Sequence, residues 1–221
     1  MITVIGDVHG KYDQYYKIAS KSEYSIQLGD FGFSSSWNKL SYSKLDPNKH
    51  KIVGGNHDDY DSAPNVDHYL GDFGRTIVGG ISIFYIRGGI SIDRVYRVGD
   101  ELNGSPKTWW SQEELNYKQM TECETLYKKT KPDIVVSHVP PQRFIENIHG
   151  NKDHSILQKF KFHVGFCENT SLLCDRLLDI HLPSLWCSGH HHRDYIETYG
   201  GRTGQMKFVS LGELSTYEIS K

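Results

Sequence analysis

The stretch ITVIGDVHG, residues 2–10, joins a short apolar segment to a turn that carries a carboxylate and an imidazole. The same pattern returns in SIQLGD, residues 25–30, and in KIVGGNHD, residues 51–58. Each apolar segment has the length and composition of a buried strand, and the segments between them are long enough for crossover connections. This order predicts successive βαβ units with a parallel sheet. Polar residues that follow such strands meet at one edge of the sheet, where sites form.

The rest of the chain alternates further strands with helices. A hairpin is expected around Gly79-Gly80, and a loop through Gly99 and Gly104. A helix is expected from an N-cap at Ser111, with Glu114 at its third position, to about residue 129. Further strands are expected at residues 133–137, 185–187, 195–198 and 206–211, and further helices before residue 20 and over residues 168–181. The chain shows no repeat or linker, so we expect a single domain over residues 1–221, with a loop or lid at 142–165.

The composition narrows the function. With 25 Lys+Arg against 27 Asp+Glu in 221 residues, the net charge is −2, which gives no overall basic field for binding nucleic acid or anionic lipid. Twelve histidines stand beside only four cysteines, a balance that favours imidazole and carboxylate ligands for any bound metal. Because no secretion signal or membrane-spanning apolar stretch is found, we expect a soluble cytoplasmic protein with reduced cysteines and no membrane partner. For a phage-encoded chain this would be the host cytoplasm.

Oxygen or imidazole donors follow five of the predicted strands. They are Asp7 with His9, Asp30, Asn56 with His57, His138, and His190 with His192. Taken singly, each group is also typical of a helix cap or a surface imidazole. Together they place too many ligand-type side chains at one edge for capping to explain, and they predict a metal centre there.

Five short motifs occur in a fixed order along the chain. They read GDVHG (residues 6–10), GDFG (29–32), GNHD (55–58), SHVP (137–140) and GHHH (189–192). This series resembles the pattern of the calcineurin-like metallophosphoesterase superfamily, and an ordered series is far more specific than one short motif. The resemblance implies an α/β fold, a four-layer α/β/β/α sandwich of two mixed β-sheets flanked by helices. It also implies a metal-dependent phosphatase or phosphodiesterase, a hydrolase of phosphate ester bonds.

The resemblance assigns seven side chains to two divalent metal ions. One ion would be held by Asp7, His9 and His192, and the other by Asn56, His138 and His190, with Asp30 as the bridge. Mn²⁺ is the first expectation, and Fe, Zn²⁺, Ni²⁺ and Mg²⁺ are alternatives, because these ligands admit several metals. In the family such a pair shares a hydroxide that attacks phosphorus in line.

The resemblance also names a catalytic histidine. His57 would lie beside the metals without binding them, and would donate a proton to the leaving group or hold a phosphoryl oxygen. Asp58 is a second catalytic candidate, since it either orients that imidazole or caps a turn. His191 should point away from its neighbours by alternation along the chain. The remaining histidines are expected on the surface or in the core: His50, His68, His149, His154, His163 and His181.

Two departures from the family pattern bear on the substrate. Asp30 is followed by Phe31-Gly32-Phe33 in place of the Asp-Arg-Gly extension of the protein Ser/Thr phosphatases, so their phosphate-clamping arginine has no counterpart here. The segment GGISIDR, residues 88–94, together with Arg97, residues 105–110 and Glu113-Glu114, is similar to an uncharacterised bacterial and phage subgroup. We therefore predict that Arg94 or Arg97 binds the substrate phosphate. The alternative is an ion pair with Asp93 that pins the loop.

The expected substrate is a phosphomonoester or phosphodiester, with a small phosphorylated metabolite or nucleotide favoured because the chain has little room for a docking domain. A protein Ser/Thr phosphatase and a nuclease, which would bind nucleic acid in a basic groove, are the enzymatic alternatives. A catalytically inactive scaffold protein is the alternative from another class, and the presence of His57 with all seven metal positions argues against it. Trp109 and Trp110 are either core anchors or part of a substrate wall. The oligomeric state stays open.

Overall fold

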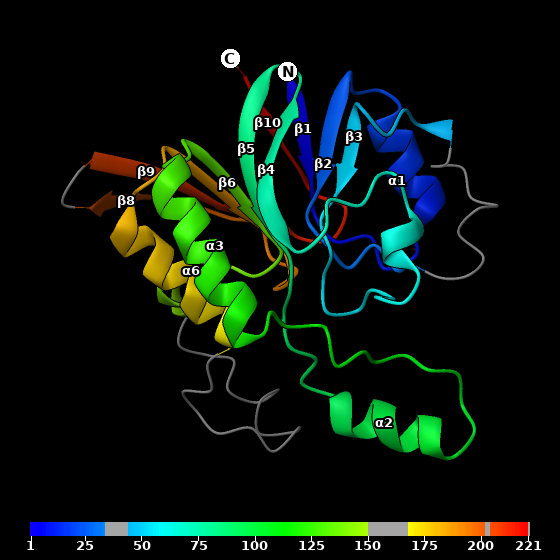
Figure 1. Cartoon of the computed structure of the whole chain (residues 1–221). Helices are drawn as coiled ribbons and strands as arrows, with labels where there is room; N and C mark the ends of the chain where they lie inside the picture. Colours follow the sequence, from blue (N-terminus) through cyan, green and yellow to red (C-terminus); the bar gives the residue numbers. More distant parts are fainter. Residues whose placement is uncertain (34–43, 150–167, 202–203, 221) are drawn as a thin grey trace.

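Two β-sheets lie face to face, and helices cover the outer face of each, as Figure 1 shows. This is a computed structural model, and it describes residues 1–33, 44–149, 168–201 and 204–220. The two sheets contain both parallel and antiparallel neighbours. The predicted four-layer α/β/β/α sandwich of two mixed sheets is therefore confirmed.

The first sheet contains the three repeated segments with which the chain begins. Its strand order is β10-β1-β2-β3, with β1 at Ile2–Ile5, β2 at Tyr24–Gln27, β3 at His50–Ile52 and β10 at Thr216–Ile219. As predicted, β1, β2 and β3 run parallel. The sequence did not indicate β10, which is antiparallel to β1 and returns the chain to the first sheet.

The second sheet has the strand order β4-β5-β6-β7-β9-β8. Its strands are β4 (Phe73–Val78), β5 (Ile81–Ile86), β6 (Ile134–Ser137), β7 (Leu185–Ser188), β8 (Tyr195–Gly201) and β9 (Gly204–Ser210). The four central strands β5, β6, β7 and β9 are parallel, and an antiparallel strand closes each edge. The predicted hairpin around Gly79 is the β4–β5 pair.

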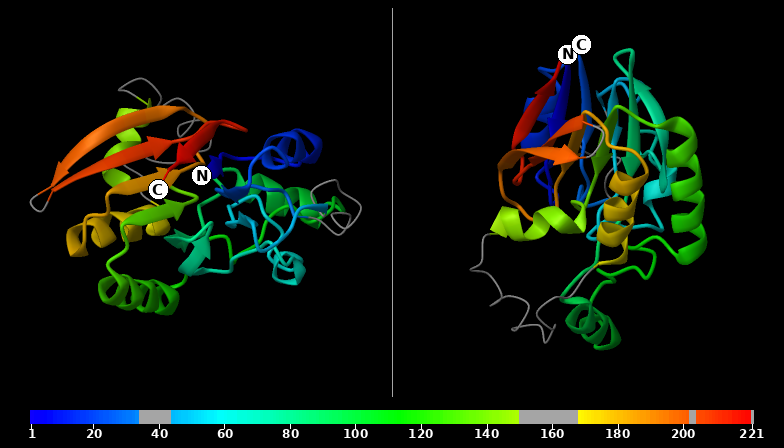
Figure 2. Two further views of the ribbon diagram at one scale, coloured as in Figure 1. Left: turned by 90° about the horizontal axis from the view of Figure 1, so that it is seen from above. Right: turned by 90° about the vertical axis from the view of Figure 1, so that its left-hand side faces the viewer.

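Three apolar layers hold these sheets and helices together. Between the sheets, side chains such as Val4 and Ile26 of the first sheet pack with Val136 and Val209 of the second. The helix α1 (Tyr12–Ala19) covers the outer face of the first sheet, where Tyr15 packs in the same cluster as the strand residues. The helices α3 (Tyr117–Thr130) and α6 (Asn169–Ile180) cover the second sheet on the opposite side, as both views in Figure 2 show.

The helix predicted from Ser111 begins later, at Tyr117. Asn116 is its N-cap and forms a capping box with Gln119, because the side-chain oxygen of each residue accepts from the backbone N–H of the other. Glu113 and Glu114 bond elsewhere: Glu113 accepts from the backbone N–H of Ser91, and Glu114 from that of Thr170. The acidic residues that resemble a helix start therefore serve tertiary contacts instead.

The expected loop through Gly99 contains a helix, α2 (Arg94–Leu102). It stands on an arm that extends away from both sheets (Figure 1), and none of its residues is buried. Short helical segments complete the described chain at η3 (Ala63–Asn65), η4 (Gln142–Phe144) and α4 (Ile145–His149). The last two occupy the start of the expected 142–165 lid or loop, whose residues 150–165 lie outside the described residues.

Three of the four cysteines, Cys123, Cys174 and Cys187, are buried and free; Cys167 lies outside the described residues, as do His154 and His163. Within the described ranges, no helix has both the length and the apolar character that crossing a bilayer requires.

Candidate metal centre

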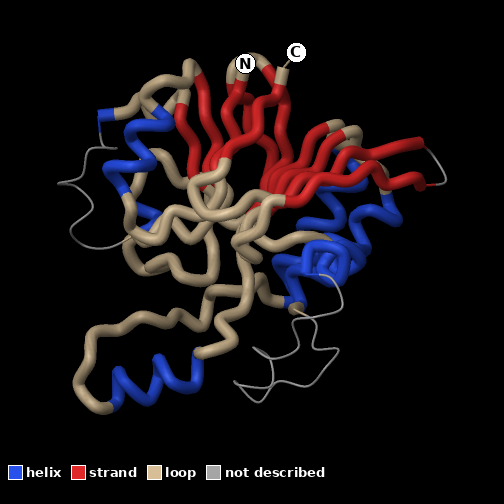
Figure 3. Tube along the Cα trace, turned by 180° about the vertical axis from the view of Figure 1, so that it is seen from behind, coloured by secondary structure: helices blue, strands red, loops and turns tan. Residues whose placement is uncertain are grey.

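The loops that follow the parallel strands gather at one rim of the sandwich (Figure 3). From the first sheet, β1 leads to Asp7 and β2 to Asp30. From the second sheet, β6 leads to His138 and β7 to His190. The structure brings all seven predicted metal ligands, the other three being His9, Asn56 and His192, to this rim, as their mutual distances show.

Four of these seven residues have a left-handed backbone conformation. Their φ angles are 47° for His9, 52° for Asp30, 69° for His190 and 52° for His192. In the described part of the chain only six residues other than glycine have a positive φ, so the conformation is concentrated at the rim. It costs about 1 kcal/mol or more per residue, and strain of this kind clusters at functional sites.

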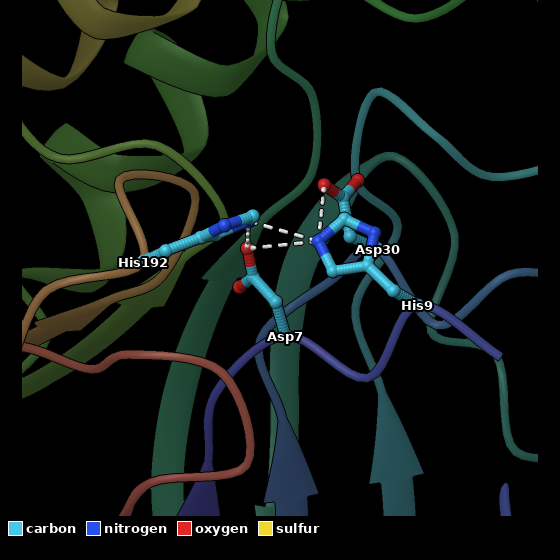
Figure 4. Close-up of side chains that lie close together, drawn as sticks. All are labelled: Asp7, His9, Asp30 and His192. Carbon is cyan, nitrogen blue, oxygen red and sulfur yellow. Dashed lines mark hydrogen bonds and ion pairs between the residues drawn. The ribbon is translucent and has the colours of Figure 1, made fainter. Parts of the chain in front are cut away.

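The first group of ligand atoms consists of Asp7, His9, Asp30 and His192 (Figure 4). The Nε2 atom of His9 lies 2.8 Å from Nε2 of His192, 3.7 Å from Oδ2 of Asp30 and 3.9 Å from Oδ2 of Asp7. The same Asp7 oxygen lies 3.0 Å from Nε2 of His192. One ligand atom from each side chain lies within 4.8 Å of all the others, which is the spacing of groups that share one ion.

The second group shares Asp30 with the first and adds His138, His190 and Asn56. The Nε2 atom of His138 lies 3.3 Å from Oδ1 of Asp30 and 3.0 Å from Oδ1 of Asn56. The rings of His138 and His190 lie 4.9 Å apart, and these two residues and Asp30 again offer ligand atoms within 4.8 Å of one another. Asp30 therefore directs one carboxylate oxygen to each group.

The hydrogen-bonding partners of His138 decide what fits the second group. Its Nδ1 atom lies 2.8 Å from the carbonyl oxygen of Leu28. Because a carbonyl oxygen only accepts, Nδ1 carries the proton of the neutral ring, and Nε2 is left with a lone pair. That lone pair faces the side-chain oxygens of Asn56 and Asp30, which are also acceptors. Three acceptors that converge without a hydrogen between them fit a divalent cation.

The charges of the residues at the rim also favour a bound cation. Asp7 and Asp30 are both fully buried. Burial and the nearby carboxylates of Asp7 and Asp58 raise the pKa of Asp30 well above its usual range, because like charges disfavour ionisation at short distance. Burial lowers the pKa of His138 to about 3, so its ring is neutral. The nearby carboxylate of Glu168 instead raises the pKa of His190 to about 9. Imidazoles around clustered carboxylates form a donor set for a metal ion.

The comparison with protein families decides the class of this site. The model described as calcineurin-like phosphoesterase matches residues 1–194. The chain belongs to this family. It is therefore a metal-dependent phosphoesterase, a hydrolase that acts on phosphate esters, and its Asp and His clusters have the ligand atoms and the spacing that a divalent metal ion requires.

Two further comparisons, with curated proteins and with solved structures, do not extend the assignment to the calcineurin-like phosphoesterase family. None of the curated proteins matches the chain. Among solved structures, the solution NMR structure of a Thermotoga maritima protein is similar at 14% sequence identity and a TM-score of 0.37, over 99% of this chain and 91% of that chain.

In this calcineurin-like phosphoesterase, His57 lies beside the first group of ligands. Its ring is 5.6 Å from that of His9, and its backbone N–H donates to Oδ1 of Asp30 at 2.8 Å. Burial, together with the charges of Arg97 and His9, lowers the pKa of His57 to about 3. The ring is thus neutral, and it is held next to the rim by its backbone bond to Asp30.

Asp58 is buried, and its carboxylate accepts backbone N–H groups. The N–H groups of Gly32 and Gly55 donate to it at 2.6 and 2.7 Å, and that of Phe33 at 3.4 Å. Burial raises the pKa of Asp58 to about 6. Of the two roles considered for Asp58, orienting the His57 imidazole and capping a turn, these contacts correspond to the second. They connect the loop after β2 to the loop after β3.

Of the two arginines predicted to bind substrate, Arg97 is the one whose charge acts on a residue of the rim, His57. Its Nε atom forms an ion pair with Oδ1 of Asp93 at 2.7 Å, the contact expected if the arginine pins the loop. The guanidinium also contributes to the low pKa of His57, so it lies within electrostatic reach of the predicted catalytic residue. Arg94 is one helical turn earlier, at the start of α2.

The two tryptophans differ in their surroundings. Trp110 is buried, and its indole N–H donates to Oδ2 of Asp61 at 2.9 Å. Trp109 is partly buried. Trp110 is therefore a core anchor. His191 is partly buried, and its Nδ1 lies 2.8 Å from Nε2 of His149 in α4.

Sequence reasoning missed three residues that contact the predicted ligands or their neighbours. Ser91 accepts from the Asn56 amide at 3.1 Å, Glu113 accepts from the Ser91 backbone at 3.1 Å, and Glu168 lies 3.0 Å from Nε2 of His190. The available signal was that Ser91 and Glu113 both belong to the residues that resemble a subgroup of the superfamily. Glu168 stands before a helix, where a carboxylate is ordinarily read as a cap.

Proposed function

We propose that this phosphoesterase hydrolyses a phosphomonoester or phosphodiester of a small metabolite or nucleotide, using two Mn²⁺ ions. One ion would be held by Asp7, His9 and His192 and the other by Asn56, His138 and His190, with Asp30 between them. The observation that carries the proposal is the position of Asp30, whose two carboxylate oxygens face separate groups of imidazole nitrogens.

The bound ions supply a hydroxide nucleophile at neutral pH and offset the charge of the phosphoryl oxygens. The chain's own residues hold the geometry for this. The backbone N–H of His190 holds the Asp7 carboxylate in place, because its nitrogen lies 3.1 Å from both carboxylate oxygens. Asp30 is fixed by the backbone N–H of His57. Groups held in this way need little reorganisation during reaction.

His57 is proposed to assist the leaving group. Its neutral ring donates one hydrogen bond and accepts another. Its Nδ1 atom is buried and has no hydrogen-bond partner among the described residues, which is the state expected of a side chain whose partner is the substrate. The ring position beside His9 places it at the edge of the ligand groups, where it reaches a substrate oxygen without binding metal.

Arg97 is proposed to bind a phosphoryl oxygen of the substrate. Its planar guanidinium has donors left after the bonds to Asp93 and to the carbonyl oxygen of Thr108, and it presents them in a fork that matches phosphate. The ion pair with Asp93 then orients the arginine, so the two interpretations of this residue are compatible.

A substrate screen tests the proposal. The purified chain with Mn²⁺ is assayed against phosphomonoesters, cyclic nucleotides, bis(aryl) phosphates and single-stranded oligonucleotides. We expect turnover of small esters, and its loss in His57→Ala and His138→Ala. Activity confined to oligonucleotides would overturn the small-substrate assignment in favour of a nuclease. Equal turnover in wild type and both variants would overturn the mechanism.

A further inference from the structure

The segment Gly88–Ser91, which follows β5, runs directly behind the second group of ligands. We call it the 88–91 strap. A Cβ atom at Gly89 would lie 3.1 Å from Oδ1 of Asn56 and 3.2 Å from Cδ2 of His138, so the strap passes tightly against both side chains. This is the segment that the sequence shares with a subgroup of the superfamily, and the proposed reaction assigns no role to it.

The strap is itself held by two buried carboxylates. The backbone N–H of Ser91 donates to Oε2 of Glu113 at 3.1 Å, and that of Ile90 to Oε1 of Glu168 at 3.2 Å. At its start, the N–H of Gly88 donates to the carbonyl oxygen of Gly54 at 3.1 Å. Each contact is buried, so the position of the strap relative to β3 and α6 is fixed.

Ser91 determines which end of the Asn56 amide faces the metal position. The Asn56 Nδ2 group donates to Ser91 Oγ at 3.1 Å. This leaves Oδ1 on the side of His138, whose Nε2 atom is 3.0 Å away. The opposite orientation would present an NH₂ group to a cation, which it cannot bind. The Ser91 hydroxyl donates to the backbone carbonyl oxygen of Asn56 at 3.5 Å, so its oxygen is left to accept from the amide NH₂ group and favours this orientation.

Glu168 has the same relationship to His190. Its Oε1 atom lies 3.0 Å from Nε2 of the imidazole, and since a carboxylate accepts, Nε2 carries a proton and Nδ1 is the nitrogen left available to a metal ion. Glu168 stands at the N-cap of α6 but makes no side-chain hydrogen bond to the helix. Its other oxygen, Oε2, is buried without a partner among the described residues. The carboxylate is therefore directed to the histidine and the strap.

We infer that Ser91 and Glu168 are positioning residues that orient Asn56 and His190 as ligands of the second metal ion. The inference rests on the proposed function, because it concerns two of the ligands proposed there. Both residues act through another side chain, and both contact the same strap. Partners of this kind fix the tautomer and direction of a ligand, and their loss weakens metal affinity by about 10- to 100-fold.

Manganese binding tests the inference without relying on turnover. Mn²⁺ is titrated into wild type, Ser91→Ala and Glu168→Gln by calorimetry, and the loaded proteins are examined by electron paramagnetic resonance. Wild type should bind two ions with a spin-coupled spectrum. Each variant should keep one ion and bind the second about 10- to 100-fold more weakly. Its spectrum should therefore be that of a mononuclear site until Mn²⁺ is high enough to fill the weakened second site. Ser91→Thr, which keeps the hydroxyl, should restore coupling.

Matched controls separate positioning from general destabilisation. Glu114→Gln changes a neighbouring carboxylate that accepts from Thr170 at the start of α6, and Ser171→Ala removes a buried hydroxyl that donates to the Pro140 carbonyl; both should bind two ions as wild type does. The retained first ion shows that a variant is folded. Wild-type affinity for both ions in Ser91→Ala and Glu168→Gln would overturn the inference alone. Failure of wild type to bind two ions would overturn the proposed function and this inference together.

Discussion

The Nε2 atoms of His9 and His192 lie 2.8 Å apart, although 183 residues separate the two histidines. His9 follows β1 of the first sheet and His192 follows β7 of the second. A metal ion held by both would therefore connect the loops of the two sheets. Since a ligand that binds only the folded state stabilises it, metal content should affect the stability of the whole sandwich as well as its activity.

Metal removal is predicted to lower the melting temperature. At free Mn²⁺ of about 100 times its dissociation constant, one ion adds about 2.7 kcal/mol to the free energy of unfolding. For a chain of this size, each kcal/mol corresponds to about 2–4 °C. Calorimetric scans with excess EDTA and with excess Mn²⁺ measure the difference. A melting temperature that is the same in both would contradict metal binding across the two sheets.

Gly55→Ala is predicted to disrupt the metal centre in a chain that still folds. A Cβ atom there would lie 2.3 Å from both the backbone nitrogen and Oδ1 of Asp30, so Asp30 has to move. A displacement of about 1 Å at a reacting centre can cost about 100-fold in rate. The matched control is Gly200→Ala, whose Cβ would meet nothing within 4 Å. Turnover and metal content are measured in both, and equal values would refute the assignment of Asp30.

Arg97→Ala is predicted to raise the KM for phosphate esters by about tenfold or more, which corresponds to the loss of a charged hydrogen bond of about 1.5–3 kcal/mol. The comparison variant is Arg94→Ala, one turn earlier on α2, for which we expect a smaller effect. Steady-state kinetics on an aryl phosphate supply the values. If KM and kcat stay unchanged in both variants, the ion pair with Asp93 is the whole role of this segment.

Two buried histidines away from the metal centre predict how stability depends on pH. Burial lowers the pKa of both His50 and His68. The charge of His68 lowers the pKa of His50 further, and the charge of Lys51 lowers the pKa of His68 further. A depressed pKa favours the neutral ring in the folded state. The stability these rings provide is therefore complete above pH 6.5 and is lost as the pH falls below it.

The measurement is the free energy of unfolding in urea between pH 7 and pH 5, on metal-free protein. Each histidine that stays neutral only when folded adds a slope of up to about 1.4 kcal/mol per pH unit. The double variant His50→Gln/His68→Gln should show a shallower dependence than wild type. Parallel curves would mean that these two rings titrate alike in the folded and unfolded chain.

Local patterns predicted the strands of the first sheet well. The apolar segments before Asp7 and Asp30 form β1 and β2 within one residue of the expected bounds, because a continuous apolar run that ends at a glycine is a property of the segment itself. The same reasoning failed for α2. Its sequence contains Gly99 and two β-branched valines, and none of its residues is buried, so intrinsic propensity does not indicate a helix.

The partners of the candidate ligands could not be predicted, since they depend on contacts between distant segments. Glu168 meets His190 across 22 positions, and Ser91 meets Asn56 across 35. Neither pair has a fixed spacing that a motif could express. The helix predicted at Ser111 shows the same difficulty, because Glu114 has the right type for a capping box but accepts from the backbone N–H of Thr170.

The central claim is that two divalent ions bind at the rim with Asp30 between them. The most direct measurement is anomalous X-ray scattering from crystals grown with Mn²⁺. The account predicts two anomalous peaks, one among Asp7, His9 and His192 and one among Asn56, His138 and His190, with an Asp30 carboxylate oxygen bound to each. A single peak, or peaks away from Asp30, would contradict it.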